Sequence, residues 1–69
     1  MAESTATVRS ITEEDDGSIW VSFFGHDGYF QIPDSENRPA IKARLTEAHN
    51  QKSEVSFTYD KDLNILTIE

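Results

Sequence analysis

One helix-forming segment stands in a chain that otherwise consists of short strand-like runs separated by turn residues. Pro39 suits the first turn of a helix, because the N–H group that proline lacks would have no partner there. From Pro39 to about Asn50, the apolar residues Ile41, Leu45 and Ala48 fall on one stripe. A helix of about twelve residues is marginal alone in water. We therefore expect the stripe to dock on a sheet.

The runs on either side of this segment are predicted to be strands, because they are rich in β-branched and aromatic residues and are bounded by turn signals such as Asp-Gly. They span residues 6–12, 18–24, 29–32, 54–59 and 63–69. In the second run, Ile19, Val21 and Phe23 share one face, and Trp20 and Phe24 share the other. The first of these faces is the more apolar and is expected to line the core.

The predicted order is β-β-β-α-β-β, which is the order of a five-stranded OB-like antiparallel barrel whose helix plugs one opening. The alternative is an open α+β sheet with the helix on one face. Residues 1–5 are expected to form a frayed N-terminus, and residues 6–69 a single OB-like domain. The register of the last strand stays open, because Ile65 and Leu66 can each face inward.

The charge of the chain restricts its partners. The net charge is −7, and residues 1–37 carry eight acidic side chains against the single base Arg9. Residues 38–69 carry five side chains of each sign. A phosphate backbone is repelled by the acidic half, so we expect no direct nucleic-acid binding. A basic protein or an uncharged ligand fits this charge better.

The 69-residue chain contains no cysteine, which excludes disulfide scaffolds, cysteine-ligated zinc and thiol nucleophiles. Small secreted domains usually need such links, so their absence favours a protein in a reducing compartment or one stabilised as a homo-oligomer. No apolar run reaches the roughly 20 residues of a membrane span. No signal-peptide segment stands at the start. The expected location is cytoplasmic, with a secreted mature form lacking its signal peptide as the alternative.

Two groups of acidic residues were considered as metal sites. The spacing within Glu13–Asp16 matches no calcium loop, and the run is interpreted as a solvated hairpin tip. Asp60, Asp62 and Asn64 match the start of an EF-hand loop, but Ile65 stands where that loop requires glycine. We therefore predict no metal site, and a turn stabilised by the Asp and Asn side chains instead.

His26 and His49 are the only side chains whose ordinary pKa lies near neutrality. His26 adjoins Asp27 in a tight turn, where sequence neighbours rarely form a catalytic pair, and His49 lies near the predicted helix end. No nucleophile elbow, phosphate loop or ligand cluster accompanies either histidine. We therefore predict no enzyme activity, no catalytic residue and no cofactor.

The stretch from Val8 to Phe23 contains a strand, an acidic loop with Glu14-Asp15-Asp16 and the strand Ile19–Phe23. This arrangement resembles the start of the Shiga-type toxin B subunit, and the length and the single helix before a final strand pair are also similar. The resemblance implies an OB-type barrel that assembles as a five-membered ring and binds glycolipid sugars. The family's cysteine pair is absent here, and Trp20 lies on the second strand rather than near the helix. No sugar-binding residue is therefore transferred to this chain.

Aromatic side chains give the strongest indication of function. If Ile19 faces the core, Trp20 and Phe24 face outward on the side of strands two and three, which is the usual ligand face of OB folds. The predicted binding residues are Trp20, Phe24 and Tyr29. The alternative is that a neighbouring subunit or the chain's own tail covers Trp20 and Phe24.

Two functions follow from these observations. The first is a non-catalytic binding module that self-associates and engages a protein or a neutral glycan through exposed aromatic residues. The second is an acidic inhibitor or immunity-type protein that occupies a basic site on a partner enzyme, as the acidic residues 1–37 indicate. The two differ in salt dependence, because charge-steered binding weakens as ionic strength rises.

Overall fold

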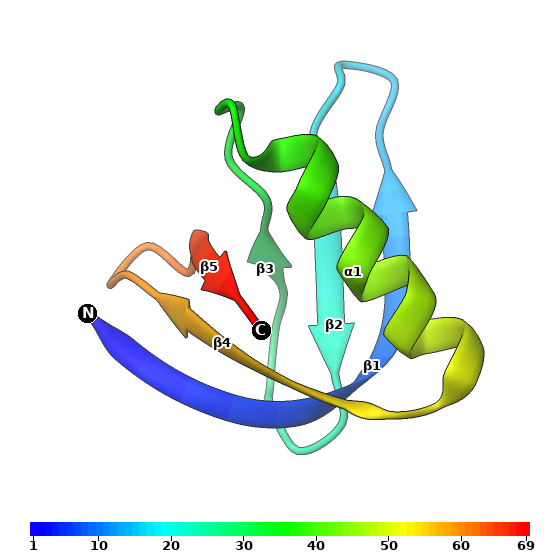
Figure 1. The fold of residues 1–69 in the computed structure, drawn as a ribbon. Coiled ribbons are helices and arrows are strands. Elements are labelled where there is room, and N and C mark those ends of the chain that lie inside the picture. Colours follow the sequence, from blue (N-terminus) through cyan, green and yellow to red (C-terminus); the bar gives the residue numbers. More distant parts are fainter.

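A computed structural model describes residues 1–69 and contains five strands and one helix (Figure 1). The elements are β1 Ala2–Glu13, β2 Ile19–Phe23, β3 Phe30–Gln31, α1 Arg38–Gln51, β4 Glu54–Tyr59 and β5 Ile65–Ile68. The strands form one antiparallel sheet in the order β3-β2-β1-β4-β5. The predicted mainly β class with one helix and five antiparallel strands is therefore confirmed.

The long strand β1 joins two halves of the sheet. Its first half pairs with β4 from Ala2 opposite Tyr59, and its second half pairs with β2 as far as Glu13 opposite Ile19. An irregularity in the pairing with β2 between Val8 and Ser10 marks the change of partner. Residues 1–5 were expected to fray, but residues 2–5 belong to β1 because their backbone pairs with β4.

The edge strand β3 meets the residues just before the other edge strand, β5, at a single point. Gln31 and Asn64 form one isolated parallel bridge, and the Gln31 N–H donates to the Leu63 carbonyl at 2.9 Å. No continuous ladder joins these edges, so the sheet is not closed and the predicted barrel is not confirmed. β3 is shorter than the predicted run 29–32, although the Ile32 N–H still donates to the Ile19 carbonyl at 3.1 Å.

The core is a single cluster of 13 buried apolar side chains on the concave side of the sheet, under α1. Its members are Ala6, Val8, Ile19, Val21, Phe23, Phe30, Ile32, Ile41, Leu45, Ala48, Val55, Phe57 and Ile65. The rings of Phe23 and Phe57 stack at 4.4 Å, and Phe30 meets both edge-on. The predicted helix stripe of Ile41, Leu45 and Ala48 is buried as expected.

Backbone conformation sets the end of α1 and the register of β5. Lys52 caps the helix in the left-handed conformation at φ 56°, so the helix ends at Gln51, one residue beyond the predicted Asn50. Leu63 is also left-handed, at φ 64°, and it delays the start of β5 to Ile65. Ile65 is fully buried, whereas Leu66 is partly exposed, which resolves the register that the sequence left open.

Candidate functional site

A groove of about 450 Å³ lies on the outer face of β1, β2 and the start of β3, and Thr12, Glu14, Trp20 and Tyr29 line it. We call it the aromatic groove. Trp20 reaches it because its neighbours Ile19 and Val21 point into the core, and alternate side chains of a strand point to opposite faces. Trp20 lies opposite Thr12 in the β1–β2 pairing, so β1 provides one wall. The Trp20 side chain is partly buried.

Tyr29 provides the second aromatic ring of the groove. It follows Gly28, whose φ of 81° is strained for any residue with a side chain, and it immediately precedes β3. Since the next residue, Phe30, is buried in the core, Tyr29 points outward and is 55% exposed. The positions of Trp20 and Tyr29 are therefore set by their sequence neighbours, which are buried in the core on the opposite face of the sheet.

Glu14 lies at the rim of the aromatic groove, in the β1–β2 loop (residues 14–18). The loop is closed at both ends, because the Glu14 N–H donates to the Ser18 carbonyl at 2.8 Å and the Gly17 N–H donates to the Glu14 carbonyl at 3.0 Å. Inside the loop, the Ser18 N–H donates to Asp16 Oδ1 at 2.9 Å. Hydrogen bonds from Ser18 lower the pKa of the Asp16 carboxyl. The backbone around Glu14 is thus well defined.

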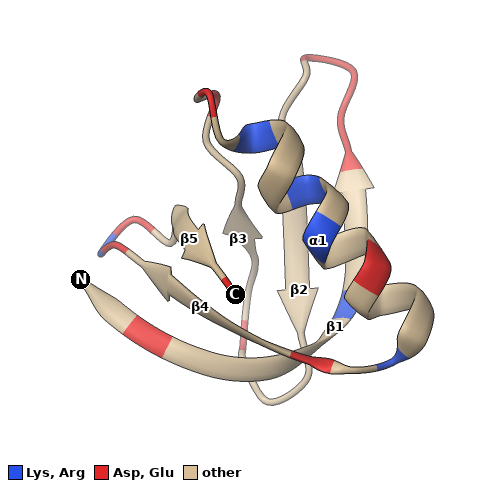
Figure 2. Cartoon of the chain, viewed as in Figure 1, with Lys and Arg blue, Asp and Glu red and all other residues tan.

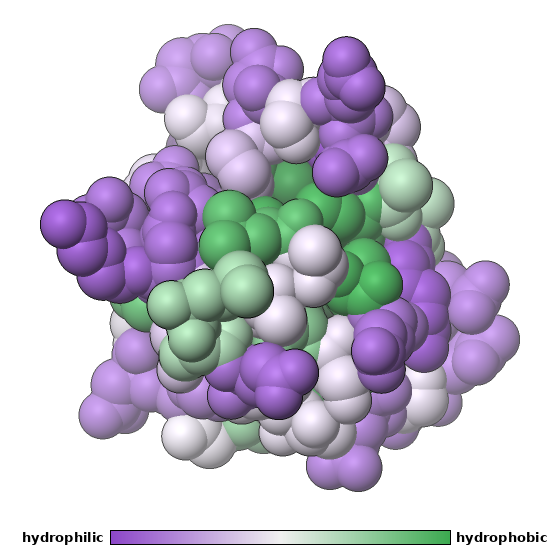
Figure 3. Space-filling view, turned by 60° about the vertical axis from the view of Figure 1, so that its left-hand side comes forward, coloured by the Kyte–Doolittle hydropathy of each residue, from purple (hydrophilic) through white to green (hydrophobic).

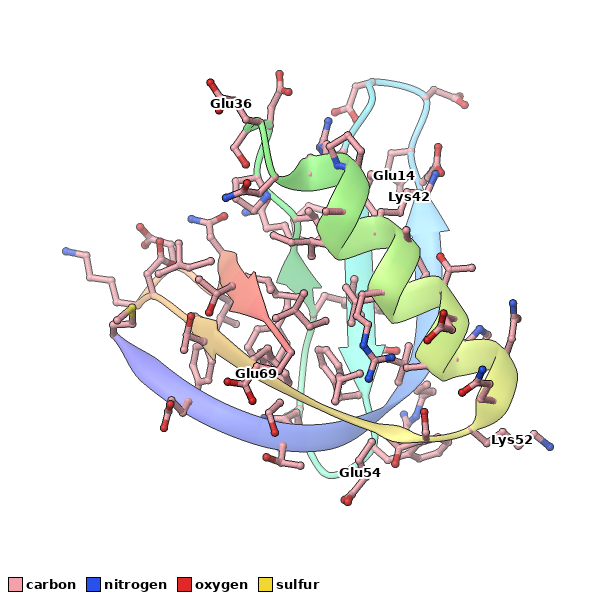
Figure 4. All side chains as sticks on the ribbon, in the orientation of Figure 1. Glu14, Glu36, Lys42, Lys52, Glu54 and Glu69 are labelled. Atoms are coloured by element: carbon pink, nitrogen blue, oxygen red, sulfur yellow. The ribbon has the colours of Figure 1, made fainter.

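The carboxylate of Glu14 has no ion-pair partner and accepts no hydrogen bond in the structure. Its neighbour Glu13 instead pairs with Lys42 of α1. Figure 4 labels Glu14 and Lys42 at this end of the sheet. The groove therefore combines two aromatic rings with a carboxylate whose hydrogen-bonding capacity is unused.

Acidic residues surround this end of the molecule. In Figure 2 the β1–β2 loop and the β3–α1 loop are both coloured as acidic and lie at the same end. The first contains Asp15 and Asp16 besides Glu14, and the second contains Asp34 and Glu36. Among these, only Asp34 contacts a base, with 4.0 Å between its Oδ1 and Nη1 of Arg38. The potential around the rim of the aromatic groove is therefore negative.

Phe24, the third predicted binding residue, lies outside the groove. β2 ends at Phe23, and Phe24 begins the turn to β3, with its N–H donating to the Thr7 carbonyl at 2.9 Å. Its ring is 55% exposed, and the guanidinium of Arg9 lies 4.9 Å from the ring centroid. The structure thus brings Trp20 and Tyr29 together and separates Phe24 from them.

Two lining residues were not selected from the sequence. The position of Thr12 opposite Trp20 follows from the hairpin register, so alternation along the hairpin could have indicated it. Glu14 was interpreted only as part of a solvated tip. Its place beside Trp20 depends on the folded β1–β2 loop, which composition does not reveal.

The other residues considered for chemistry lie elsewhere in the fold. Nε2 of His26 is 2.8 Å from Oγ of Ser4, and the His26 ring packs edge-on against Phe30 at 5.3 Å. His26 thus covers one end of the aromatic core cluster. His49 is exposed in the last turn of α1.

Asp60 organises the turn between β4 and β5. Its Oδ1 accepts hydrogen bonds from the N–H groups of Asp62 and Asn64 at 2.9 and 3.0 Å, and its Oδ2 accepts one from the Asn64 amide at 3.1 Å. These hydrogen bonds, those from Asn64 above all, lower the pKa of the Asp60 carboxyl. The side chains that match the start of an EF-hand loop therefore stabilise a turn, as predicted.

No group of three or more His, Asp or Glu side chains is arranged to hold a metal ion. The single helix is neither long enough nor apolar enough to cross a membrane. No protein-family model, curated protein or solved structure matches the chain.

Proposed function

We propose that this protein is a non-catalytic binding module that engages a protein partner through the aromatic groove. The observation that carries the proposal is the junction of Trp20 and Tyr29 with the unpaired carboxylate of Glu14 on one outer sheet face. Exposed aromatic residues dominate the energetics of protein interfaces when a partner desolvates them. The charge of −7 favours a partner with a basic surface.

We further propose that the sheet is a partly open OB-type barrel. The strand order, the helix between β3 and β4, and the parallel bridge between Gln31 and Asn64 support this assignment. In OB folds, ligands bind on the face of strands two and three beside the loop that joins strands one and two. The aromatic groove is lined by residues of β1, β2 and the loop between them, which supports the assignment.

The experiment compares two variants, Tyr29→Ala and Phe24→Ala, whose native side chains are equally exposed. Tyr29 and Phe24 are both 55% exposed, but only Tyr29 lines the groove. Trp20 is the only tryptophan, so its fluorescence reports on the groove in every variant. Titration with panels of basic peptides and neutral oligosaccharides should give a ligand whose affinity falls about tenfold in Tyr29→Ala. Phe24→Ala should bind the ligand as tightly as the native protein does. Equal losses of affinity in the two variants would refute the groove as the binding site.

The alternative ligand, a neutral glycan, has its own expected result in the same titration. Glycans stack on aromatic rings without a charge term, so their affinity should hardly change between low and moderate salt. A basic peptide should bind less tightly as salt rises. The salt dependence of the first ligand found therefore separates the two partner classes.

A second candidate function is an acidic inhibitor or immunity-type protein that occupies a basic site on an enzyme. The grouping of the β1–β2 and β3–α1 loops at one end of the molecule favours it (Figure 2). In that case Asp15, Asp34 and Glu36 contribute as much as Glu14 does. Removing the charges of these three residues would then abolish binding, whereas Tyr29→Ala would leave binding unchanged. That result would support the inhibitor function over binding through the aromatic groove.

Self-association is the remaining part of the proposal, and a different surface supports it. Figure 3 shows an apolar area on the face that carries β5. A hollow of about 200 Å³ there is lined by apolar side chains of α1 and β5, namely Ala40, Ile41, Leu66 and Ile68. Light scattering should give a mass above 7.8 kDa that returns to 7.8 kDa in Leu66→Lys. A native protein that is already monomeric at high concentration would refute self-association.

A further inference from the structure

We propose that the aromatic groove recognises an arginine side chain presented by a basic segment of the partner. The inference rests on the proposed function and adds the chemistry of the group that is bound. In this arrangement the guanidinium stacks on Trp20 and its N–H groups donate to the carboxylate of Glu14. Tyr29 closes the other side of the groove.

The two aromatic rings of the groove suit a guanidinium in both shape and charge. The face of an aromatic ring carries partial negative charge, and tryptophan attracts a cation more strongly than tyrosine or phenylalanine does. A guanidinium is flat and weakly hydrated, so it can lie against an indole with little cost of desolvation. Trp20 is partly buried, so only part of its surface remains to be desolvated when a ligand binds.

The carboxylate of Glu14 is available to accept directed hydrogen bonds from a ligand. Glu14 has no partner within the chain, whereas the adjacent Glu13 is already paired with Lys42. A carboxylate accepts two parallel hydrogen bonds from a guanidinium, which an ammonium group cannot donate in the same geometry. The groove therefore favours arginine over lysine.

The protein already contains one contact of this kind on its surface. The guanidinium of Arg9 lies 4.9 Å from the centroid of the Phe24 ring, with no carboxylate taking part. The aromatic groove offers the larger indole ring together with a free carboxylate. The interaction of a partner's guanidinium with the groove should therefore be more favourable than that of Arg9 with Phe24.

Charge decides between a basic segment and a neutral glycan. The loops around the groove carry Asp15, Asp16 and other carboxylates that stay largely unpaired. These charges raise the local concentration of a cationic ligand and give nothing to an uncharged sugar. A partner segment with several basic residues thus complements both the groove and its rim.

The test is a fluorescence titration of Trp20 with acetylated peptides in which glycine alternates with arginine, lysine or citrulline. Citrulline keeps the shape of arginine but carries no charge. We expect the arginine peptide to bind about five- to thirty-fold more tightly than the citrulline peptide. We expect the lysine peptide to bind between the two. A neutral oligosaccharide is titrated in parallel.

Glu14→Gln and Asp15→Asn form the matched pair of variants. Each removes one negative charge from the β1–β2 loop, but only Glu14 lines the groove. Glu14→Gln should lower the affinity for the arginine peptide about five- to thirty-fold, and Asp15→Asn should lower it about twofold. Equal losses in the two variants, or equal binding of the arginine and citrulline peptides, would overturn the inference. Failure of the arginine peptide to bind at millimolar concentration would overturn it as well.

Tyr29→Ala separates failure of the inference from failure of the proposed function. If the oligosaccharide or the citrulline peptide binds best and Tyr29→Ala weakens it, the groove is the binding site but arginine is not its ligand. If the arginine peptide binds Tyr29→Ala and the native protein equally, both the inference and the proposed function fail. Tyr29→Ala should leave the fold intact, because the Tyr29 side chain is 55% exposed and lies outside the buried core cluster.

Discussion

Removal of the Leu45 side chain tests whether α1 is an integral layer of the fold. Leu45 is fully buried in the middle of the helix stripe, between Ile41 and Ala48. Leu45→Ala removes the branched end of the side chain and leaves a cavity between helix and sheet. Buried leucine-to-alanine changes cost about 2–5 kcal/mol in free energy of unfolding. We expect about 3 kcal/mol here, since the helix is held at both ends and can collapse only partly into the cavity.

That loss is a large part of the stability of a chain this size, which is about 3–10 kcal/mol. It should lower Tm by roughly 12–24 °C. Urea unfolding followed by Trp20 fluorescence gives the free energy directly. Thr46→Ala, an exposed change one residue further along the helix, serves as the control and should stay within about 0.5 kcal/mol of the native value.

A loss of less than about 1 kcal/mol in the free energy of unfolding of Leu45→Ala would refute the reasoning, because removing a buried leucine side chain from a packed helix–sheet interface costs more than that. If Leu45→Ala does not fold at all, Ile41→Val provides the milder change. Ile41 is 4% exposed, and its substitution should cost about 0.5–1.5 kcal/mol. A native-like free energy in Ile41→Val would contradict the packing in the same way.

Three further predictions concern the backbone and its turns. Lys52→Gly should raise the free energy of unfolding by about 0.5–1 kcal/mol, because Lys52 adopts a left-handed conformation that glycine accepts without strain; a lower urea midpoint would contradict this. Asp60 has a folded-state pKa below its unfolded value of about 3.9, so its contribution to stability is present above about pH 4 and is lost as pH falls through the folded pKa. The difference in urea midpoint between the native protein and Asp60→Asn should therefore shrink as pH falls below about 4, and a difference that does not change with pH would contradict the assignment. The Gln31 amide should exchange slowly with solvent, because it donates to Leu63 across the two sheet edges, and exchange as fast as that of an exposed loop amide would show that the edges separate.

Local patterns predicted much of this fold. β4 has the predicted bounds Glu54–Tyr59, because its alternation of apolar and polar residues matches a strand buried on one face. The helix was predicted within one residue at each end, since Pro39 and the apolar stripe are local signals. The extent of β1 was not predictable in the same way. Residues 2–5 are mostly polar, and they become a strand only because distant residues of β4 pair with them.

The candidate site was predictable in part. Strand alternation and turn position placed Trp20 and Tyr29 on the outer face, where the structure has both. Phe24 is exposed as alternation predicts, but β2 ends one residue earlier, the chain turns there, and the Phe24 ring does not line the groove. Glu14 depends on the closed conformation of its loop, which is fixed by hydrogen bonds that no periodicity encodes.

The shared strand β1 also orders the folding reaction in time. Its contacts with β2 join residues close in sequence, whereas Thr5 and Ser56, whose hydroxyls meet at 2.9 Å, are 51 residues apart. Closing so long a loop is slow compared with forming a hairpin. We therefore expect the meander of β1, β2 and β3 to form early and the pairing with β4 to limit the rate. All four residues that line the aromatic groove lie within that meander, so we expect the groove to form before the last strands join the sheet.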